Sequence, residues 1–121
     1  MWGMASQLSD ATIEAIAAYY SAQAPSPAKK GDEKLMVRGK QIFEEGVAKQ
    51  GIPACASCHG PQAHGNNIFP RLAGQHADYL VKQMLVIQSA LRAAPVMHGV
   101  IKDLAQDQMR AVAIYLESLG S

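Results

Sequence analysis

The chain has 121 residues, a length that fits one small domain with room for a short appendage. It carries 11 Lys+Arg against 10 Asp+Glu, and this near balance argues against a nucleic-acid binder, which normally shows a strong basic excess. No run approaches the roughly 18 apolar residues that a membrane span requires, and the N-terminus lacks the basic region and apolar core of a secretory signal.

The first predicted element is a helix over residues 8–22. Ser9 is a suitable N-cap for this helix. Apolar residues then recur at helical spacing, at Ile13, Ile16, Ala17 and Tyr20. Prolines and small residues fill the range 24–31, and this composition predicts an extended linker after the helix.

A second helix is predicted from Glu33 to about Lys49. Its apolar residues form one stripe that consists of Leu35, Met36, Gly39, Ile42, Phe43 and Val47. Gly51 and Pro53 follow, and we expect these two residues to end the helix because neither favours a continued helical turn.

The stretch Cys55-Ala56-Ser57-Cys58-His59 comes next and contains both cysteines of the chain. Two cysteines at this spacing can each form a thioether to one haem vinyl group, and the histidine after them is then held under the iron as an axial ligand. A redox Cys-X-X-Cys would need a βαβ setting, but no strand pattern flanks this one. A structural zinc site needs four ligands, usually from two such pairs, and the second pair is missing. We therefore interpret the stretch as the attachment site of one covalent haem c.

Residues 60–75 are rich in Gly, Pro and Asn and show no sustained period, which predicts a long irregular loop. A loop of this length is unusual in a compact domain unless something orders it, and the edge of a haem would do so.

Two more helices are predicted in the last third of the chain. The first covers residues 77–92, where Leu80, Met84, Ile87 and Leu91 lie at helical spacing, and Pro95 closes it. Residues 95–103 are expected to form a second loop. The final helix runs from Leu104 to Leu119, and its apolar face consists of Val112, Tyr115, Leu116 and Leu119.

A short internal repeat links the two ends of the chain. The segment Leu8–Tyr20 aligns with Leu104–Leu116 at a constant offset of 96 residues, and the same offset places Met1 on Met97. The repeat predicts three parts: residues 1–24 as the terminal loop and helix of a preceding, similar domain, residues 25–32 as a linker, and residues 33–121 as a mono-haem domain.

The haem motif, the loop Phe69-Pro70-Arg71-Leu72-Ala73-Gly74-Gln75-His76 and a late Met before a terminal helix together resemble a class I cytochrome c. More narrowly, GIPACASCHGP and PRLAGQHADYLVKQ are similar to the C-terminal domain of a dihaem cytochrome c4. The resemblance covers residues 33–121. It implies an all-α fold with three main helices and loops around a covalent haem c, to which the helix over 8–22 is an extra element.

The same resemblance implies that the N- and C-terminal helices of the haem domain cross beside the haem. Gly39 gives a physical reason for this crossing, because a residue without a Cβ lets an opposing helix approach closely. Tyr115 and Val112 are the expected partners of Gly39 on the final helix.

His59 is the predicted proximal ligand, and the resemblance implies that its second ring nitrogen donates a hydrogen bond to the carbonyl of Pro70. The candidates for the sixth ligand are Met97, Met84, Met109, Met36, His64, His76 and His98. Methionine within a helical run is more often core filler, whereas Met97 lies in a predicted loop where the resemblance places the axial methionine. We therefore assign Met97 to the iron, with His98 as its rival. Arg71, Tyr79 and Gln83 have three alternative roles: each could hydrogen-bond a haem propionate, close the loop, or serve as an ordinary surface or packing residue.

With both axial positions filled, substrate or oxygen has no ready place to bind, so we expect one-electron transfer and not an enzyme. A thioether ligand also favours ferrous iron. The expected protein is part of a multi-haem periplasmic carrier, with redox partners such as a terminal oxidase, reductase or dehydrogenase. Two alternatives are a haem module or cytochrome subunit of a larger oxidoreductase, and a ligand-binding haem enzyme or sensor with a labile sixth ligand.

Covalent haem attachment of this kind is, by the same resemblance, an extracytoplasmic process. We therefore expect a periplasmic protein and regard the sequence as a fragment, an expressed segment or a mature form that lacks its export signal. The apolar face of the helix over 8–22 has nothing of its own to cover it. We expect these residues to pack on the haem domain or to pair with another molecule, which includes a dimer through this helix.

Overall fold

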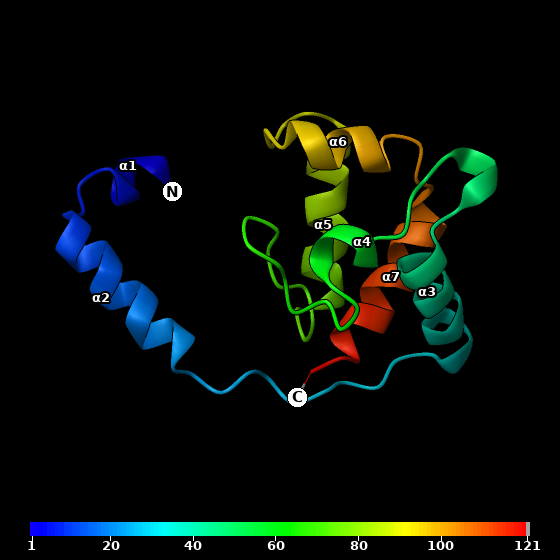
Figure 1. Ribbon diagram of the computed structural model, residues 1–121, viewed down its shortest axis with the longest axis horizontal. Helices are drawn as coiled ribbons and strands as arrows, with labels where there is room; N and C mark the ends of the chain where they lie inside the picture. Colours follow the sequence, from blue (N-terminus) through cyan, green and yellow to red (C-terminus); the bar gives the residue numbers. More distant parts are fainter. Residues whose placement is uncertain (121) are drawn as a thin grey trace.

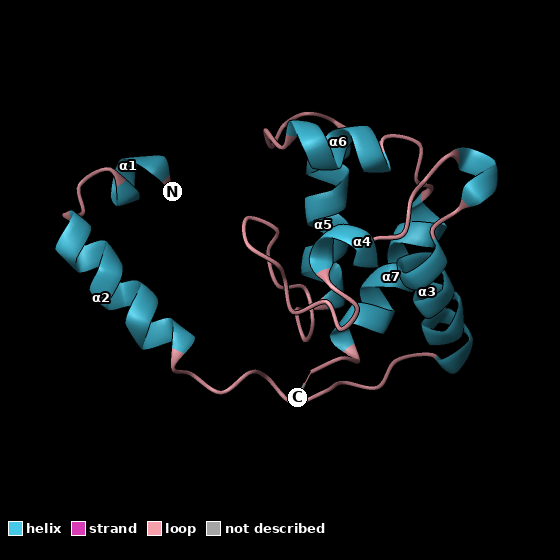
Figure 2. Ribbon diagram, viewed as in Figure 1, coloured by secondary structure: helices cyan, strands magenta, loops and turns pink. Residues whose placement is uncertain are grey.

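The computed structural model describes residues 1–120, and its regular structure in this range is helical (Figure 2). In chain order the helices are α1 (Trp2–Ala5), α2 (Asp10–Ser21), α3 (Glu33–Glu45), α4 (Ala56–His59), α5 (Ala77–Gln88), α6 (Pro95–Ile101) and α7 (Gln106–Glu117), with a 3-10 turn at Ala48–Gln50. Within the described residues, extended pairing is limited to two isolated bridges. No helix of residues 1–120 has both the length and the apolar character needed to cross a membrane. The predicted all-α fold with an additional N-terminal helix is confirmed.

Helices α3 and α7 make the most extensive contact in the fold (Figure 1). A Cβ placed on Gly39 of α3 would lie 2.1 Å from the carbonyl oxygen of Ala111 and 2.8 Å from the Cβ of Tyr115, both on α7. Beside this contact the rings of Phe43 and Tyr115 lie 5.8 Å apart, and Phe43 is fully buried. The expected crossing is therefore present. Tyr115 lies at the crossing as predicted, while Ala111, and not Val112, lies nearest to the glycine.

Helix α3 ends at Glu45, so the prediction that it reaches Lys49 was wrong. Gly46 ends the helix with a φ of 75°, and a Cβ at this position would lie 2.2 Å from the carbonyl oxygen of Ile52. The chain turns back here because Val47 and Ile52 pair their backbones at 2.8 and 3.2 Å. This pairing across a short turn is what the helical period of the sequence could not indicate.

The segment between α5 and α7 also differs from the prediction. Helix α5 ends at Gln88, because Ala90 adopts a left-handed φ of 61°, and Leu91 is 82% exposed instead of lying on the apolar face. The prediction of a loop over residues 95–103 was also wrong. Pro95 begins helix α6 and occupies its first helical position, where the fixed φ of proline suits a helix. The loop predicted over residues 60–75 contains no helix or strand and is confirmed.

Helices α1 and α2 lie apart from the remaining helices (Figure 1). Helix α2 begins where predicted, since the Ser9 side chain accepts a hydrogen bond from the Thr12 backbone N–H at 3.2 Å. No residue of either helix is buried. The structure therefore does not show residues 8–22 packed on the haem domain, which was one of the two expected arrangements.

The linker is extended, as predicted, but it lies against the domain. A Cβ on Gly120 would lie 2.6 Å from the carbonyl oxygen of Ser26 and 2.7 Å from the backbone nitrogen of Ala28. The Lys29 N–H donates to the carbonyl of Glu117 at 3.4 Å. The end of α7 thus holds the chain where it enters the domain.

Candidate functional site

The two cysteines and His59 belong to one helical turn. Cys55 is the N-cap of α4, which carries Cys58 and His59. Neither thiol is in a disulfide; both are half-buried, and they line the same cavity as His59. Burial raises the pKa of the Cys55 thiol above its ordinary value, with a smaller contribution from the neighbouring Cys58. The turn thus directs two sulfur atoms and one imidazole to a common space.

This cavity has a volume of about 570 Å³ and lies between α4, α5, α6, α7 and the loop over residues 60–75. Its size falls within the roughly 300–1,000 Å³ typical of cofactor and ligand pockets. The lining is mainly apolar and includes Leu72, Leu80, Val100, Ile101, Leu104 and Leu116. A large, flat, apolar group is the kind of occupant that such walls can cover.

His59 is held in one orientation by the loop. Its side chain is buried, and its Nδ1 atom lies 2.9 Å from the carbonyl oxygen of Pro70. Because a carbonyl can only accept, Nδ1 carries the hydrogen, and Nε2 keeps its lone pair free for a metal. The contact that the resemblance implied between His59 and Pro70 is present.

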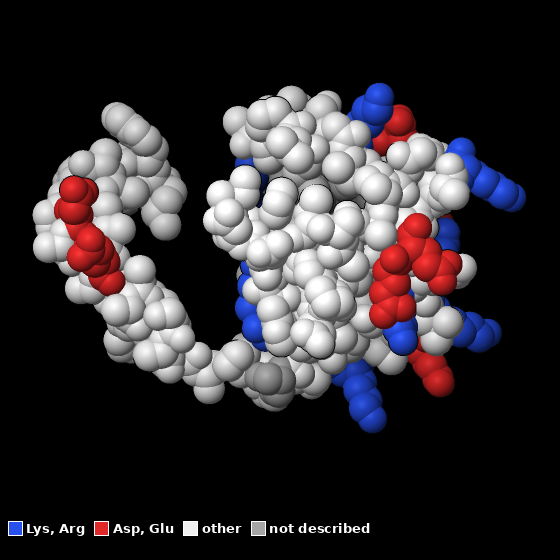
Figure 3. Space-filling view, in the orientation of Figure 1, with Lys and Arg blue, Asp and Glu red and all other residues white. Residues whose placement is uncertain are grey.

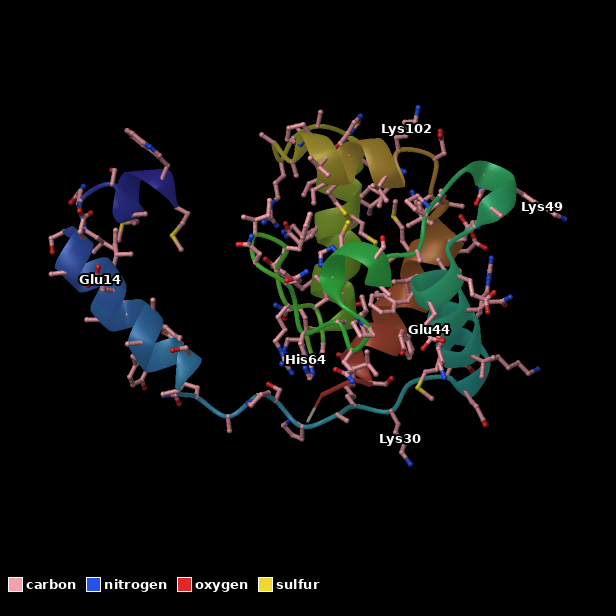
Figure 4. All side chains as sticks on the ribbon, in the orientation of Figure 1. Glu14, Lys30, Glu44, Lys49, His64 and Lys102 are labelled. Carbon is pink, nitrogen blue, oxygen red and sulfur yellow. The ribbon has the colours of Figure 1, made fainter. Side chains whose placement is uncertain are left out.

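Two of the seven candidates for the sixth ligand line the cavity: Met97 from α6 and Met84 from α5. Met97 lies on a helix, so its predicted place in a loop was wrong. The rival His98 is engaged elsewhere, since its Nδ1 lies 3.0 Å from the carbonyl oxygen of Ile87. The other four candidates do not line the cavity within the described residues. Of the two methionines, Met109 is fully buried in the core and Met36 lies on α3. Of the two histidines, His64 is exposed at the edge of the loop (Figure 4) and His76 is exposed beside Glu117.

Arg71, Tyr79 and Gln83 all line the cavity. The Arg71 Nε–H donates to the carbonyl of Ala73 at 3.2 Å, and the Gln83 side-chain oxygen accepts from Arg92 at 2.7 Å. Tyr79 is about half-exposed at the rim. The structure therefore brings all three predicted polar candidates to one cavity.

The sequence reasoning missed the cavity wall formed by α6. Because residues 95–103 are expected to form a loop, the prediction does not place their apolar side chains on one common helix face. A signal was present, because Pro95 is followed by Met97, Val100 and Ile101 at i, i+3 and i+4, the spacing of one helix face. Ile68 and Val96, which are 81% and 69% exposed at the cavity, carried no sequence signal.

The donor set fits a covalent haem c. Two thiols stand ready for thioethers, the imidazole of His59 has a free Nε2, and a thioether sulfur comes from the α6 wall. The apolar walls suit a porphyrin, and the lining includes a cationic side chain from the loop over residues 60–75, that of Arg71.

Comparison with known proteins gives a consistent result. A family model described as cytochrome c matches residues 36–120. Cytochrome c-552 of Acidithiobacillus ferridurans is 39% identical over 120 residues, which are 98% of this chain and 52% of that protein. A thiosulfate dehydrogenase electron acceptor of Thiomonas intermedia is 38% identical over 122 residues, which are 96% of this chain and 56% of that protein.

A crystal structure of reduced recombinant cytochrome c4 from Pseudomonas stutzeri matches with a TM-score of 0.88 and 37% identity. The match covers 96% of this chain and 64% of that one. The chain thus spans little more than half the length of the two relatives named above. Because the family model covers most of its residues, the chain belongs to the cytochrome c family, which implies a covalently bound haem c.

Proposed function

We propose that this chain transfers single electrons through one haem c, attached by thioethers from Cys55 and Cys58 and ligated by His59 and Met97. The observation that supports this most directly is that these four side chains, from α4 and α6, line one apolar cavity. When bound, haem c supplies an iron centre that gains and loses one electron. Cytochrome names among the relatives support the same role.

Each protein group has a defined part in this function. The hydrogen bond from His59 to Pro70 fixes the plane of the imidazole and the direction in which Nε2 faces. The thioether of Met97 is a soft, uncharged ligand that favours the reduced metal. Because His59 and Met97 would both be ligands of the iron, no site would be left for a reacting substrate, and the chain would transfer electrons without bond chemistry. Arg71 and Tyr79 are the proposed contacts for the haem carboxylates.

The partner is a redox protein, and the cavity rim indicates how it would approach. Ile68, Tyr79 and Val96 are exposed at the cavity, and the domain face seen in Figure 3 is largely free of charged side chains, which gather at its margins. Such a surface suits brief, close contact with a terminal oxidase, reductase or dehydrogenase. The location is the periplasm, where the covalent attachment typical of this family takes place.

The repeat supports the division into residues 1–24, 25–32 and 33–121. Helix α2 covers Asp10–Ser21 and α7 covers Gln106–Glu117, so both ends of the two helices coincide at the offset of 96 residues. Helices α1 and α6 end at Ala5 and Ile101, which differ by the same offset. We infer that residues 1–24 are the end of a preceding similar domain. The exposed apolar face of α2 would then pack against the rest of that preceding domain. Alternatively, it would pair with a second copy of this chain.

A haem module within a larger oxidoreductase is the second candidate. It is favoured by the similarity to a thiosulfate dehydrogenase electron acceptor and by the greater length of that protein. The two candidates differ in whether the donor is a separate molecule. In the full-length protein, reduction of this haem at a rate that rises with the concentration of a diffusing donor supports the free carrier; a rate independent of that concentration supports the module.

Absorption spectra of the ferric and ferrous holoprotein, with and without carbon monoxide, test the proposal. We expect a six-coordinate spectrum and no carbon monoxide adduct in the native chain, and rapid adduct formation in Met97→Ala. Rapid adduct formation by the native chain would instead favour a ligand-binding enzyme or sensor. A Met97→Ala spectrum identical to the native one would show that Met97 is not the ligand.

A further inference from the structure

Helix α6, which carries Met97, is a short element with few anchors of its own. It has seven residues, and its N-cap Ala94 provides no side-chain hydrogen bond. Among the described helices its main packing partner is α5. A helix of this length is not stable by itself, so the position of Met97 depends on what holds α6 to α5.

Gln88, the last residue of α5, holds the C-terminal end of α6. Its side-chain nitrogen Nε2 lies 2.9 Å from the carbonyl oxygen of Ile101, 3.0 Å from that of Lys102 and 3.0 Å from that of Leu104. The last carbonyls of a helix lack partners within the helix. One amide group, whose two hydrogens are shared among three acceptors, therefore satisfies the end of α6 and the start of the following turn.

His98 of α6 makes a contact in the opposite direction. Its Nδ1–H donates to the carbonyl oxygen of Ile87 at 3.0 Å, and Ile87 directly precedes Gln88. Both side chains are half-buried, which reduces the competition of water for these bonds. Two neighbouring residues at the end of α5 are thus joined to α6 by hydrogen bonds that cross between the helices.

We propose that Gln88 and His98 are positioning residues that keep Met97 directed into the cavity. Successive residues of a helix are about 100° apart around its axis, so the bond that turns His98 toward α5 also fixes the direction of the adjacent Met97. Gln88 fixes the same helix along its axis. The proposal rests on the function proposed above and adds the residues that keep its sixth ligand in place.

The physical consequence is a change in population. When α6 moves away from α5, the sixth position opens, and an added ligand binds only to that open fraction of molecules. The apparent affinity for the added ligand rises in proportion to the open fraction. Loss of the Gln88 hydrogen bonds, which stabilise only the closed arrangement, raises that fraction about tenfold, given the usual net contribution of such bonds.

Titration of the ferric holoprotein with imidazole, followed by absorption, measures this population. We expect Gln88→Met, which keeps the volume but removes the donors, to bind imidazole about tenfold more tightly than the native chain. Gln108→Met is the matched control. Gln108 is also half-buried and also bonded through its side chain, to Ala105 at 2.9 Å and Gln50 at 2.8 Å, but it does not contact α6 through these bonds. The control is expected to stay within about twofold of the native value.

Hydrogen exchange of the backbone amides of residues 98–104 gives a second readout that does not depend on ligand binding. These amides are expected to exchange faster in Gln88→Met and at the native rate in Gln108→Met. His98→Asn keeps a donor near the position of Nδ1 and is expected to resemble the native chain, whereas His98→Leu should resemble Gln88→Met. The His98 pair decides the question if Gln88→Met gives no folded holoprotein.

Imidazole affinity and amide exchange in Gln88→Met that match those of Gln108→Met would overturn the proposal. A failure of the underlying site has a different signature. If Met97 is not the ligand, Met97→Ala leaves the native spectrum unchanged. If only the positioning role is wrong, Met97→Ala still changes the spectrum, while the Gln88 and His98 variants keep the native imidazole affinity and the native rate of amide exchange.

Discussion

The Nδ1 atom of His59 donates to the carbonyl of Pro70, so a loop residue sets the direction in which the second ring nitrogen faces. The atom proposed to bind the iron is therefore oriented by the backbone of a segment that has no regular structure. This arrangement explains why an irregular loop can be an essential part of a rigid site. The loop is fixed in turn by the core, since the Gly74 N–H donates to the carbonyl of Leu116 on α7 at 2.9 Å.

Substitution of the two cavity methionines by leucine separates a ligand from core filler. Met84→Leu conserves volume at a buried position, so we expect a loss of less than about 1.5 kcal/mol in the free energy of unfolding and an unchanged spectrum. Met97→Leu removes the sulfur but keeps the apolar volume, so it should open the sixth position to carbon monoxide. Spectra with and without carbon monoxide, together with denaturant unfolding, measure both effects. The reverse pattern would assign the ligand to Met84.

Single residues differ in how well the sequence indicates their roles. Cys55, Cys58 and His59 form one contiguous motif whose chemistry is local, so the sequence alone predicts their use. The hydrogen bond to Pro70 followed only from a family resemblance. Gln88 carried no signal, because a polar residue at the end of an amphipathic helix does not indicate which distant carbonyls it will meet.

At the scale of elements, the crossing of α3 and α7 depends on the absence of one side chain. We expect Gly39→Ala to destabilise the domain by about 1–3 kcal/mol, because the new Cβ would overlap the Ala111 backbone, which cannot give way as a flexible side chain would. Gly99 is the control: it lies in α6 with nothing within 4 Å of a Cβ, so Gly99→Ala should be neutral or slightly stabilising. Denaturant unfolding measures both. Equal stability of the two variants would contradict the close crossing.

An ion pair between α7 and α3 gives the stability of the domain a pH dependence. The hydrogen bond from the Arg38 guanidinium to Asp107, at 2.7 Å, lowers the pKa of Asp107 below its usual value. A carboxyl whose folded-state pKa is lowered stabilises the fold above its unfolded-state value of about 3.9, and this contribution is lost as the pH falls through the folded-state value.

We therefore expect Asp107→Asn to have a slightly lower melting temperature than the native chain at pH 7 and an equal one in acid. The difference should be small and should shrink in high salt, because both side chains are largely exposed. Melting curves across this pH range test the prediction. A difference that grows as the pH falls would show the opposite sign of linkage.

The sequence predicted which helices exist more reliably than where they end. The apolar stripe of α3 was evident, but its end at Gly46 depends on the short turn that pairs Val47 with Ile52, which an apolar stripe does not indicate. Helix α6 was missed because its short apolar face follows a proline that was interpreted as the end of the preceding helix. Both errors lie at helix ends, where a turn residue or a proline decides the conformation and the apolar stripe does not.

For the molecule as a whole, the two N-terminal helices differ from the other α-helices of residues 1–120, because no side chain of α1 or α2 is buried. Ile13 and Ile16 of α2 are 47% and 42% exposed, although they correspond by the 96-residue offset to Met109 and Val112, which are buried in α7. The same pattern of side chains is thus covered in one copy of the repeat and open to solvent in the other. The internal repeat was visible in the sequence, but its consequence for exposure required the structure.

Deletion of residues 1–24 tests whether this segment is independent of the haem domain. We expect the shortened chain to keep the native spectrum and melting temperature, because no residue of α1 or α2 is buried. Its binding of an apolar dye and its self-association should decrease, since the exposed apolar face is gone. Calorimetry and sedimentation measure these properties. A large fall in melting temperature would show that the segment packs on the domain after all.

The intact mass of the protein, after production in a host that attaches haem outside the cytoplasm, shows whether Cys55 and Cys58 carry a haem. We expect a coloured protein whose mass exceeds that of the polypeptide by one haem, and a Cys55→Ser/Cys58→Ser double variant with no added mass. A colourless native protein with the mass of the bare polypeptide would show that no haem is attached at these cysteines.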